Sequence, residues 1–140
     1  MIALAEIPAA PEIADRLGLA LGAPVFHSLI VHRENDVPVQ LEDRHVAPAQ
    51  APGYLAQDFV RSTPNAFLSA VAPLSHAEHA VEAVLPQPWE CRLLAIARTD
   101  PCLLVHRRTF AGLAPVSLAR LVYPGGRYRL EGRFSGASAG

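Results

Sequence analysis

The segment from residue 37 to residue 48, VPVQLEDRHVAP, ends its apolar run in four consecutive ionisable residues, Glu42, Asp43, Arg44 and His45. Side chains two positions apart on a strand lie on one face, so we expect Glu42 and Arg44 side by side. The two charges can pair with each other, or they can divide between the two ends of a bound ligand. The alternative is the solvated end of a strand, where an exposed ion pair is worth about 0–1 kcal/mol. The first interpretation predicts the polar floor of a ligand pocket.

His32 lies at the end of the preceding strand, and the hairpin turn decides which face it joins. A plain two-residue turn places His32 opposite Val39, away from Glu42 and Arg44. A bulged turn shifts the parity by one residue and places His32 with that pair. The pattern of residues leaves both arrangements open, and a lone histidine near a turn is more often simply exposed.

Arg107 and Arg108 are adjacent on a predicted strand, so they point to opposite faces of the sheet. Arg107 shares its face with Leu103, Val105 and Thr109. A buried arginine requires a partner, and an inward Arg107 therefore indicates an acidic side chain or a ligand carboxylate.

Three further side chains have the chemistry to contact a ligand. Ser117 alternates with apolar residues and can donate a hydrogen bond, although an ordinary small strand residue is the simpler interpretation. Tyr123 and Tyr128 flank a PGG turn, and a tyrosine can stack on a planar ligand and donate its hydroxyl. The alternative for both tyrosines is packing at a strand end.

Metal binding and catalysis find little support in the sequence. His76 and His79 are three residues apart, which brings them together on a helix but separates them on a strand. Neither a cysteine nor a third histidine lies close to them in the sequence, so we expect no metal and no cofactor. The chain has no GxSxG motif and no phosphate-binding glycine loop, so we do not expect an enzyme.

The composition limits the class of protein. A chain of 140 residues suits one domain, and its net charge of −1 argues against a free-standing DNA-binding module, which needs a basic stripe. Cys91 and Cys102 form no CxxC pair, which is typical of a reduced compartment. The first residues lack the basic n-region and unbroken apolar h-region of a signal peptide, and no apolar run reaches membrane-spanning length, so we expect a cytoplasmic protein without a membrane partner.

Periodicity and turn residues place these side chains on a set of short elements. Helices are predicted over residues 10–19, 63–72 and 87–97, the last with Trp89, Leu93 and Ile96 inward, and a loop is predicted over residues 47–62. Strands are predicted over residues 25–33, 38–46, 75–86, 102–110, 115–124 and 127–134. The segment 75–86 is ambiguous because its alternation favours a strand whereas its alanines and glutamates favour a helix, and we prefer the strand.

Turn and cap residues support several of these boundaries. Pro11 suits the first turn of a helix, and Thr63 followed by Pro64 is typical of an N-cap and the N1 position. Asn35 and Asp36 tolerate the positive φ of a tight hairpin. Short connections require antiparallel neighbours. The sequence therefore predicts an α+β fold, one antiparallel sheet of about six strands with flanking helices.

Five stretches, in this order and with these gaps, carry a family resemblance: VFHSLIVHRENDVPVQLEDRHVAP, STPNAFL, PLSHAEHAVEA, DPCLLVHRRTF and YPGGRYRLEGRF. Over about residues 11–135 they resemble the effector-binding (UTRA) domain of GntR-superfamily transcription regulators, in the branch that includes the regulators of histidine utilisation. The resemblance implies a chorismate-lyase-like fold around a buried small-molecule site. It also implies a UTRA domain over residues 11–140, a linker remnant over residues 1–10, and a winged helix-turn-helix that is absent from this chain.

The resemblance further implies an effector and an assembly. In the histidine-utilisation branch the effector is urocanate, which carries a carboxylate and an imidazole. Arginine suits the carboxylate and a glutamate suits the imidazole N–H. The family resemblance also favours the bulged hairpin. The expected ligand-binding residues are His32, Glu42, Arg44, Arg107, Ser117, Tyr123 and Tyr128.

We expect a homodimer that releases DNA through the missing domain when the effector binds. Two alternatives stay open, a small enzyme of the chorismate-lyase type and a dimerisation module without a ligand. A fully packed interior without a polar cavity would be the sign of the second.

Overall fold

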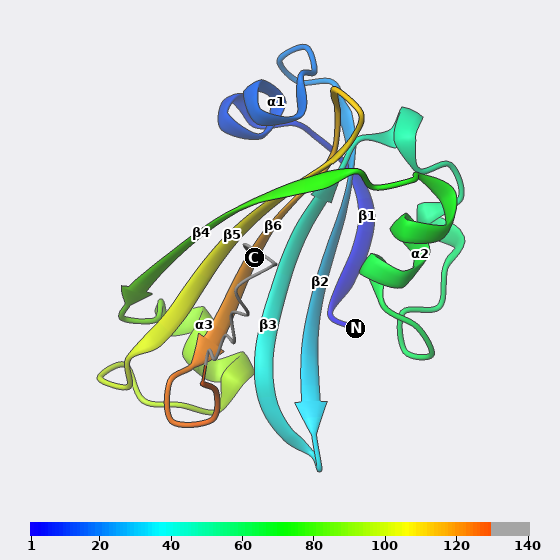
Figure 1. Cartoon of the computed structure of the whole chain (residues 1–140). Coiled ribbons are helices and arrows are strands. Elements are labelled where there is room, and N and C mark those ends of the chain that lie inside the picture. Colours follow the sequence, from blue (N-terminus) through cyan, green and yellow to red (C-terminus); the bar gives the residue numbers. More distant parts are fainter. Residues whose placement is uncertain (130–140) are drawn as a thin grey trace, which may run out of the picture.

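Six antiparallel strands form one sheet in the computed structural model, which describes residues 1–129 (Figure 1). Their order across the sheet is β1-β2-β3-β6-β5-β4, so β1 and β4 are the two edges. The strands are β1 (Ala3–Pro8), β2 (Pro24–Glu34), β3 (Val37–Val46), β4 (His76–Val84), β5 (Cys102–Ala111) and β6 (Ala114–Pro124). The helices are α1 (Pro11–Leu17), α2 (Pro64–Val71) and α3 (Pro88–Leu94), with short 3-10 helices η1 (Pro48–Gln50) and η2 (Tyr54–Ala56). This arrangement confirms the predicted α+β class.

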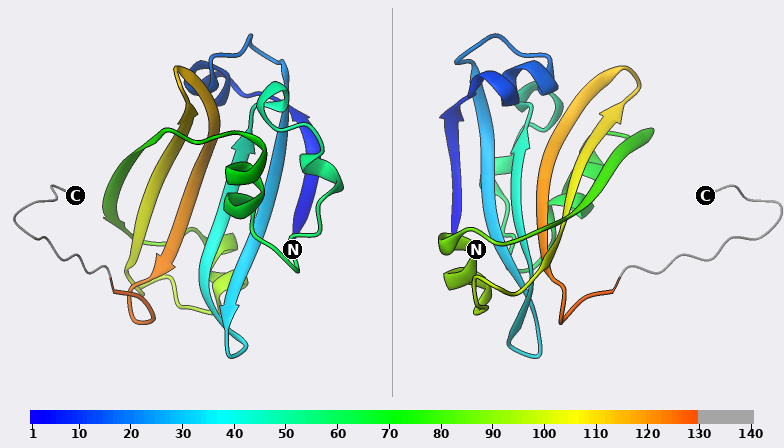
Figure 2. Two further views of the ribbon diagram at one scale, coloured as in Figure 1. Left: turned by 45° about the vertical axis from the view of Figure 1, so that its right-hand side comes forward. Right: turned by 90° about the vertical axis from the view of Figure 1, so that its left-hand side faces the viewer.

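Alternation along the strands gives the sheet two different faces. One face, here called the Glu42 face, carries Glu42 and Arg44 of β3. The other, the Asp43 face, carries Asp43 and His45 of the same strand. The helices α2 and α3 lie on opposite sides of the sheet (Figure 2). Helix α2 with η2 covers one end of the Glu42 face, while α1 and α3 cover the Asp43 face.

Three apolar clusters hold these helices on the sheet. On the Glu42 face, Tyr54, Phe59 and Leu68 pack on strand residues. On the Asp43 face, Leu94 of α3 and Leu17 of α1 belong to two separate clusters. Between these two clusters the Asp43 face carries the polar side chains of Asp43, His45 and Arg120.

The local signals in the sequence act as predicted at several boundaries. Thr63 accepts a hydrogen bond from the Ala66 amide at 3.1 Å and caps α2. Asn35 and Asp36 form the β2–β3 turn with φ of 51° and 64°. Gly18 ends α1 with φ of 67°, a conformation that costs glycine no steric strain. The ambiguous segment 75–86 is a strand, β4, as preferred.

Three expectations need correction. Residues 1–10 are not a linker remnant, because Ala3–Pro8 pair along their whole length with β2 as an edge strand. The strand predicted over 127–134 is absent at residues 127–129, which follow a turn, and its remaining residues lie outside the described part of the chain. Trp89 was expected to point inward from α3 but stays exposed, since Leu94 and Cys91 take the buried side of that helix.

Candidate functional site

A bulge in the β2–β3 hairpin decides the position of His32. The register shifts between His32 and Arg33, so His32 pairs with Gln40 rather than with Val39. This is the bulged arrangement, and it places His32 on the Glu42 face. The His32 Nε2 and Glu42 Oε1 atoms lie 2.8 Å apart.

Polar side chains from four strands form one continuous hydrogen-bonded chain on the Glu42 face. Arg44 Nε donates to Glu42 Oε2 at 2.7 Å, and Arg44 Nη1 donates to Ser117 Oγ at 3.0 Å. The Ser117 hydroxyl lies 2.7 Å from the hydroxyl of Thr109. Together with His32, these residues are called the Glu42–Arg44 network. Glu42 and Arg44 are only 4% and 3% exposed, so this is an interior ion pair and not the solvated strand end that was the alternative.

The electrostatics of the network depend on mutual pairing. Burial raises the pKa of the Glu42 carboxyl, but the hydrogen bond with His32 and the charge and hydrogen bond of Arg44 outweigh burial and leave that pKa below its ordinary value. Glu42 is therefore a carboxylate at neutral pH. Both of its oxygens are occupied by protein donors, so it accepts a further donor only as an additional bond.

Arg107 differs from Arg44 because its buried Nε has no hydrogen-bond partner within the described residues 1–129. Burial lowers the pKa of the Arg107 guanidinium, and the charge of Arg44 lowers it further. Arg107 borders a cavity of about 270 Å³ on the Glu42 face. The lining residues of this cavity, called the Arg107 cavity, are His79, Val81, Val105, Arg107, Leu121, Tyr123 and Tyr128. Arg107 is half-buried, and a guanidinium at a cavity wall is suited to bind an anion.

Two tyrosines form one wall of the Arg107 cavity. The rings of Tyr123 and Tyr128 are stacked with their centroids 4.0 Å apart. The Tyr123 hydroxyl accepts a hydrogen bond from Gln40 Nε2 at 2.7 Å. Stacked aromatic rings beside a guanidinium can hold a planar, conjugated acid.

The interior also contains a polar pair that the sequence interpretation missed. The Tyr54 hydroxyl lies 2.8 Å from Ser28 Oγ, and both residues are fully buried. Burial raises the pKa of Tyr54 to about 12, against a smaller opposite effect of the bond to Ser28. Tyr54 lies in the segment predicted as a loop over residues 47–62, and its contacts with Ser28 and Phe26 of β2 hold it over the sheet.

All seven residues that the sequence predicted for the site belong to this face or its rim. His32, Glu42, Arg44 and Ser117 form the network, whereas Arg107, Tyr123 and Tyr128 line the cavity. Their role in ligand binding stays a prediction. The polar cavity does not match the fully packed interior expected of a dimerisation module without a ligand.

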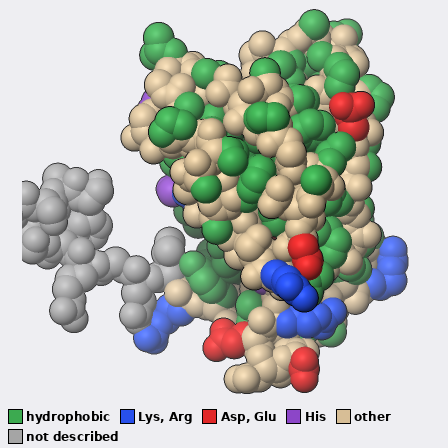
Figure 3. Space-filling model, turned by 90° about the vertical axis from the view of Figure 1, so that its right-hand side faces the viewer, with side chains coloured by type: hydrophobic (Ala, Val, Ile, Leu, Met, Phe, Trp, Pro, Cys, Tyr) green, Lys and Arg blue, Asp and Glu red, His purple; other side chains and the backbone are tan. Residues whose placement is uncertain are grey.

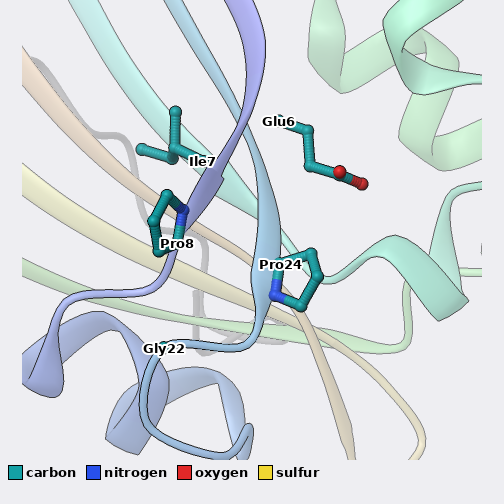
Figure 4. A pocket seen from close by; sticks show the side chains of 5 residues that line it. All are labelled: Glu6, Ile7, Pro8, Gly22 and Pro24. Atoms are coloured by element: carbon teal, nitrogen blue, oxygen red, sulfur yellow. The ribbon is translucent and has the colours of Figure 1, made fainter.

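A second hollow of about 230 Å³ lies where β1 and β2 meet the α1 loop (Figure 4). Glu6 and Ile7 project to opposite sides of β1, and the remaining lining residues are prolines and Gly22. This hollow contains one carboxylate and no cation, so it is unsuited to an acidic ligand. The molecular surface seen from the β1 and α2 side shows scattered apolar side chains, with charged groups of both signs gathered toward one end (Figure 3).

Among the described helices, none has the length and apolar character needed to cross a membrane.

Comparison with known proteins places this geometry in a family. The UTRA domain model matches residues 1–129. The histidine utilization repressor of Pseudomonas putida is 60% identical over 135 residues, covering 96% of this chain and 54% of that repressor. The histidine utilization repressor of Klebsiella aerogenes is 54% identical over 121 residues, covering 86% and 50%. The chain thus spans about half the length of the curated relatives it matches.

Solved structures show the same fold. The C-terminal domain of the histidine utilization repressor from Pseudomonas syringae superposes with a TM-score of 0.93 at 55% identity, covering 96% of this chain and 95% of that one. PhnF from Mycobacterium smegmatis, 23% identical, superposes with a TM-score of 0.86, covering 96% and 61%. The fold, the family model and the repressor relatives agree, and the chain therefore belongs to the UTRA family, as a relative of the C-terminal effector domains of GntR-type histidine utilization repressors.

Proposed function

We propose that this chain senses urocanate, or a similar small carboxylate, for a transcriptional repressor of histidine utilisation. The observation that carries the proposal is Arg107, which lines a cavity with a tyrosine wall and whose buried Nε has no hydrogen-bond partner within the described residues. The names of the relatives suggest the histidine-utilisation pathway, and the residues that line the cavity suggest an acidic ligand. The volume of the cavity, about 270 Å³, lies just below the usual range of about 300–1,000 Å³ for ligand pockets, which suits a small acid.

Urocanate has the two ends that this site can bind. Its carboxylate would accept hydrogen bonds from Arg107, and the planar fork of the guanidinium is suited to two carboxylate oxygens. Its conjugated plane would pack on Tyr123 and Tyr128. Its imidazole would then point toward His32 and Glu42, where a carboxylate can accept the ring N–H.

We propose that the effector controls DNA binding by a separate N-terminal domain, since the repressor relatives are about twice as long as this chain. A ligand shifts a conformational equilibrium only by its difference in affinity for the two states. Urocanate must therefore bind more tightly to the arrangement of two effector domains that releases operator DNA. We propose that this coupling, and not turnover of the ligand, is the role of the domain.

Thermal melting with four small molecules tests the proposal. A ligand that binds only the native state stabilises it by RT ln(1 + [L]/Kd), about 2.7 kcal/mol at a hundredfold excess over Kd. We expect urocanate to raise the Tm, and histidine, imidazole propionate and chorismate to raise it less. Conversion of chorismate into products would favour the chorismate-lyase alternative. Equal Tm values with and without all four compounds would contradict a urocanate sensor.

We also propose that the domain forms a homodimer through β4. Every residue of this edge strand except Val84 is exposed, and among the described strands it pairs with β5 alone. An open edge with apolar side chains on its face is a typical site for association with another chain. Val81 lies in the middle of that strand on the Glu42 face, next to the Arg107 cavity.

Val81→Asp is therefore expected to weaken dimer formation by at least about tenfold, since it places a charge in an apolar contact. Sedimentation equilibrium over a range of concentrations measures the effect. Leu113→Asp is the matched control, because Leu113 is 97% exposed at the β5–β6 turn whereas Val81 is 48% exposed. The proposal would be wrong if the wild-type chain were monomeric, or if Leu113→Asp weakened dimer formation more than Val81→Asp does.

A further inference from the structure

Two imidazoles and a carboxylate meet on the Asp43 face of the sheet, on the side opposite the Arg107 cavity. His27 of β2 is the direct cross-strand partner of His45 on β3, and Asp43 precedes His45 by two residues on the same face. One ligand atom from each residue lies within 4.8 Å of the others. Within residues 1–129 this is the one group of three or more His, Cys, Asp or Glu side chains that gathers in this way.

We propose that His27, Asp43 and His45 bind one divalent transition-metal ion. Neutral imidazole and carboxylate are common ligands of Zn²⁺, and sites with two histidines and one carboxylate also bind other first-row ions. Three protein ligands leave at least one coordination position for water or another donor. This is the arrangement of an accessible metal site and not of a closed structural one.

The backbone holds the three side chains close to the spacing that an ion requires. Tetrahedral coordination with metal–ligand bonds of about 2.0–2.1 Å places ligand atoms about 3.3 Å apart. His27 Nε2 and Asp43 Oδ1 are 2.7 Å apart, and the rings of His27 and His45 lie 4.6 Å apart between centroids. Small side-chain rotations therefore suffice, since β2 and β3 fix all three Cα positions.

An ion can reach this cluster from solvent. His27 and Asp43 are 21% and 24% exposed, and Asp43 and His45 border a hollow of about 190 Å³ between α1 and the sheet. Access and partial burial together favour a site, because a fully exposed cluster would compete poorly with water and a sealed one would exclude the ion.

The surrounding charges are compatible with a cation. Arg120 borders the same hollow, but its guanidinium is paired with the buried Glu90, which offsets its charge. Glu12 of α1 adds a further carboxylate to the lining. His106 also borders the hollow and lies 3.1 Å from Glu82, so it is engaged elsewhere.

Titration with Co²⁺ and Zn²⁺ tests the site on the 140-residue chain. We expect one Co²⁺ per chain, with the visible absorption of a low-coordinate cobalt complex, and displacement by Zn²⁺. His27→Gln, His45→Gln and Asp43→Asn should each weaken Zn²⁺ binding by at least about tenfold in calorimetry. His76→Gln is the matched control. His76 is exposed on the edge strand β4 and stacks on Phe110 of β5, whereas the cluster lies on β2 and β3.

Circular dichroism of each variant confirms that it is folded before its affinity is compared. Zn²⁺ affinity that is unchanged in Asp43→Asn and His45→Gln, or that falls equally in His76→Gln, would overturn the proposal. In that case the three residues would form only a hydrogen-bonded His27–Asp43 pair with the His45 ring tilted against His27.

Discussion

Arg44→Met is expected to lower the free energy of unfolding by about 3–5 kcal/mol, the usual cost of removing one partner from a buried ion pair. The substitution roughly keeps the length of the side chain but leaves Glu42 buried and charged without its arginine partner. It also removes the donor that Arg44 gives to Ser117. Urea denaturation, with the slope held common to both proteins, measures the loss.

Arg61→Met is the matched control for this prediction. Arg61 also pairs with a carboxylate, that of Asp58, but both side chains are exposed and their closest atoms are 3.5 Å apart. An exposed pair contributes little, so the control should change stability by less than about 1 kcal/mol. A cost of that small size for Arg44→Met as well would mean that water reaches Glu42 in solution.

The same network predicts a pH dependence of stability. The pKa of Glu42 in the folded domain lies below its ordinary value of 4.5, so its contribution is fully present above that value. As the pH falls through the lower folded-state pKa, the carboxylate takes up a proton and the contribution is lost. Glu42→Gln should therefore give a flatter stability curve than wild type in urea titrations below neutral pH.

Glu42→Leu combined with Arg44→Met separates the worth of the pair from the cost of breaking it. Replacing both partners of a buried pair by apolar residues is often close to neutral. Here His32 and Ser117 would still lose a partner each, so the double variant should recover only part of the loss seen in Arg44→Met. If the double variant lost as much stability as Arg44→Met alone, the loss would come from the whole network and not from the single unpaired charge.

Local sequence signals predicted much of the fold because they act over a few residues. Thr63 caps the start of α2 through one hydrogen bond, and residues 76–84 form strand β4 despite the helix propensity of their alanines. The first strand was missed because Ala3–Pro8 is short and its sequence, ALAEIP, shows no alternation of polar and apolar residues. This strand is stabilised by pairing with β2, and such a contact between distant segments cannot be predicted from local sequence.

The part of the site that could be predicted follows from one rule, that residues two positions apart on a strand lie on the same face. That rule correctly joined Glu42 with Arg44, but the parity of His32 depended on a bulge in the partner strand. Tyr54 reaches the interior through the path of a loop, which no periodicity describes. The histidine cluster on the Asp43 face was missed for a similar reason, because the cross-strand register that places His27 beside His45 is a tertiary property.

Arg107→Met is expected to abolish most of the urocanate affinity without lowering the stability of the ligand-free domain. Removing one partner of a buried charge pair in a complex costs about 2–5 kcal/mol, at least about thirtyfold in Kd. In the ligand-free domain the same side chain buries an Nε that has no partner within residues 1–129. Its removal there relieves a desolvated charge, so the Tm should stay the same or rise.

Calorimetry with urocanate and thermal melting of the ligand-free chain measure the two halves of this prediction. Arg108→Met is the matched control, because Arg108 follows on the same strand but pairs with Glu78 on the opposite face. It should leave urocanate affinity unchanged, and any loss of stability from its ion pair is a separate effect. Arg107→Lys keeps the charge but loses the planar fork, and is expected to bind with intermediate affinity.

Stability and affinity that move in opposite directions are what distinguish a ligand-binding arginine from a structural one. An arginine that serves the fold, such as Arg44, has its donors occupied and costs stability when removed. An arginine kept for a ligand carries an unmet donor until the ligand arrives, and the fold tolerates that cost because the surrounding strands are held elsewhere. A large loss of stability in Arg107→Met with unchanged urocanate affinity would reverse the assignment of Arg107 and would move the effector site to the Glu42–Arg44 network.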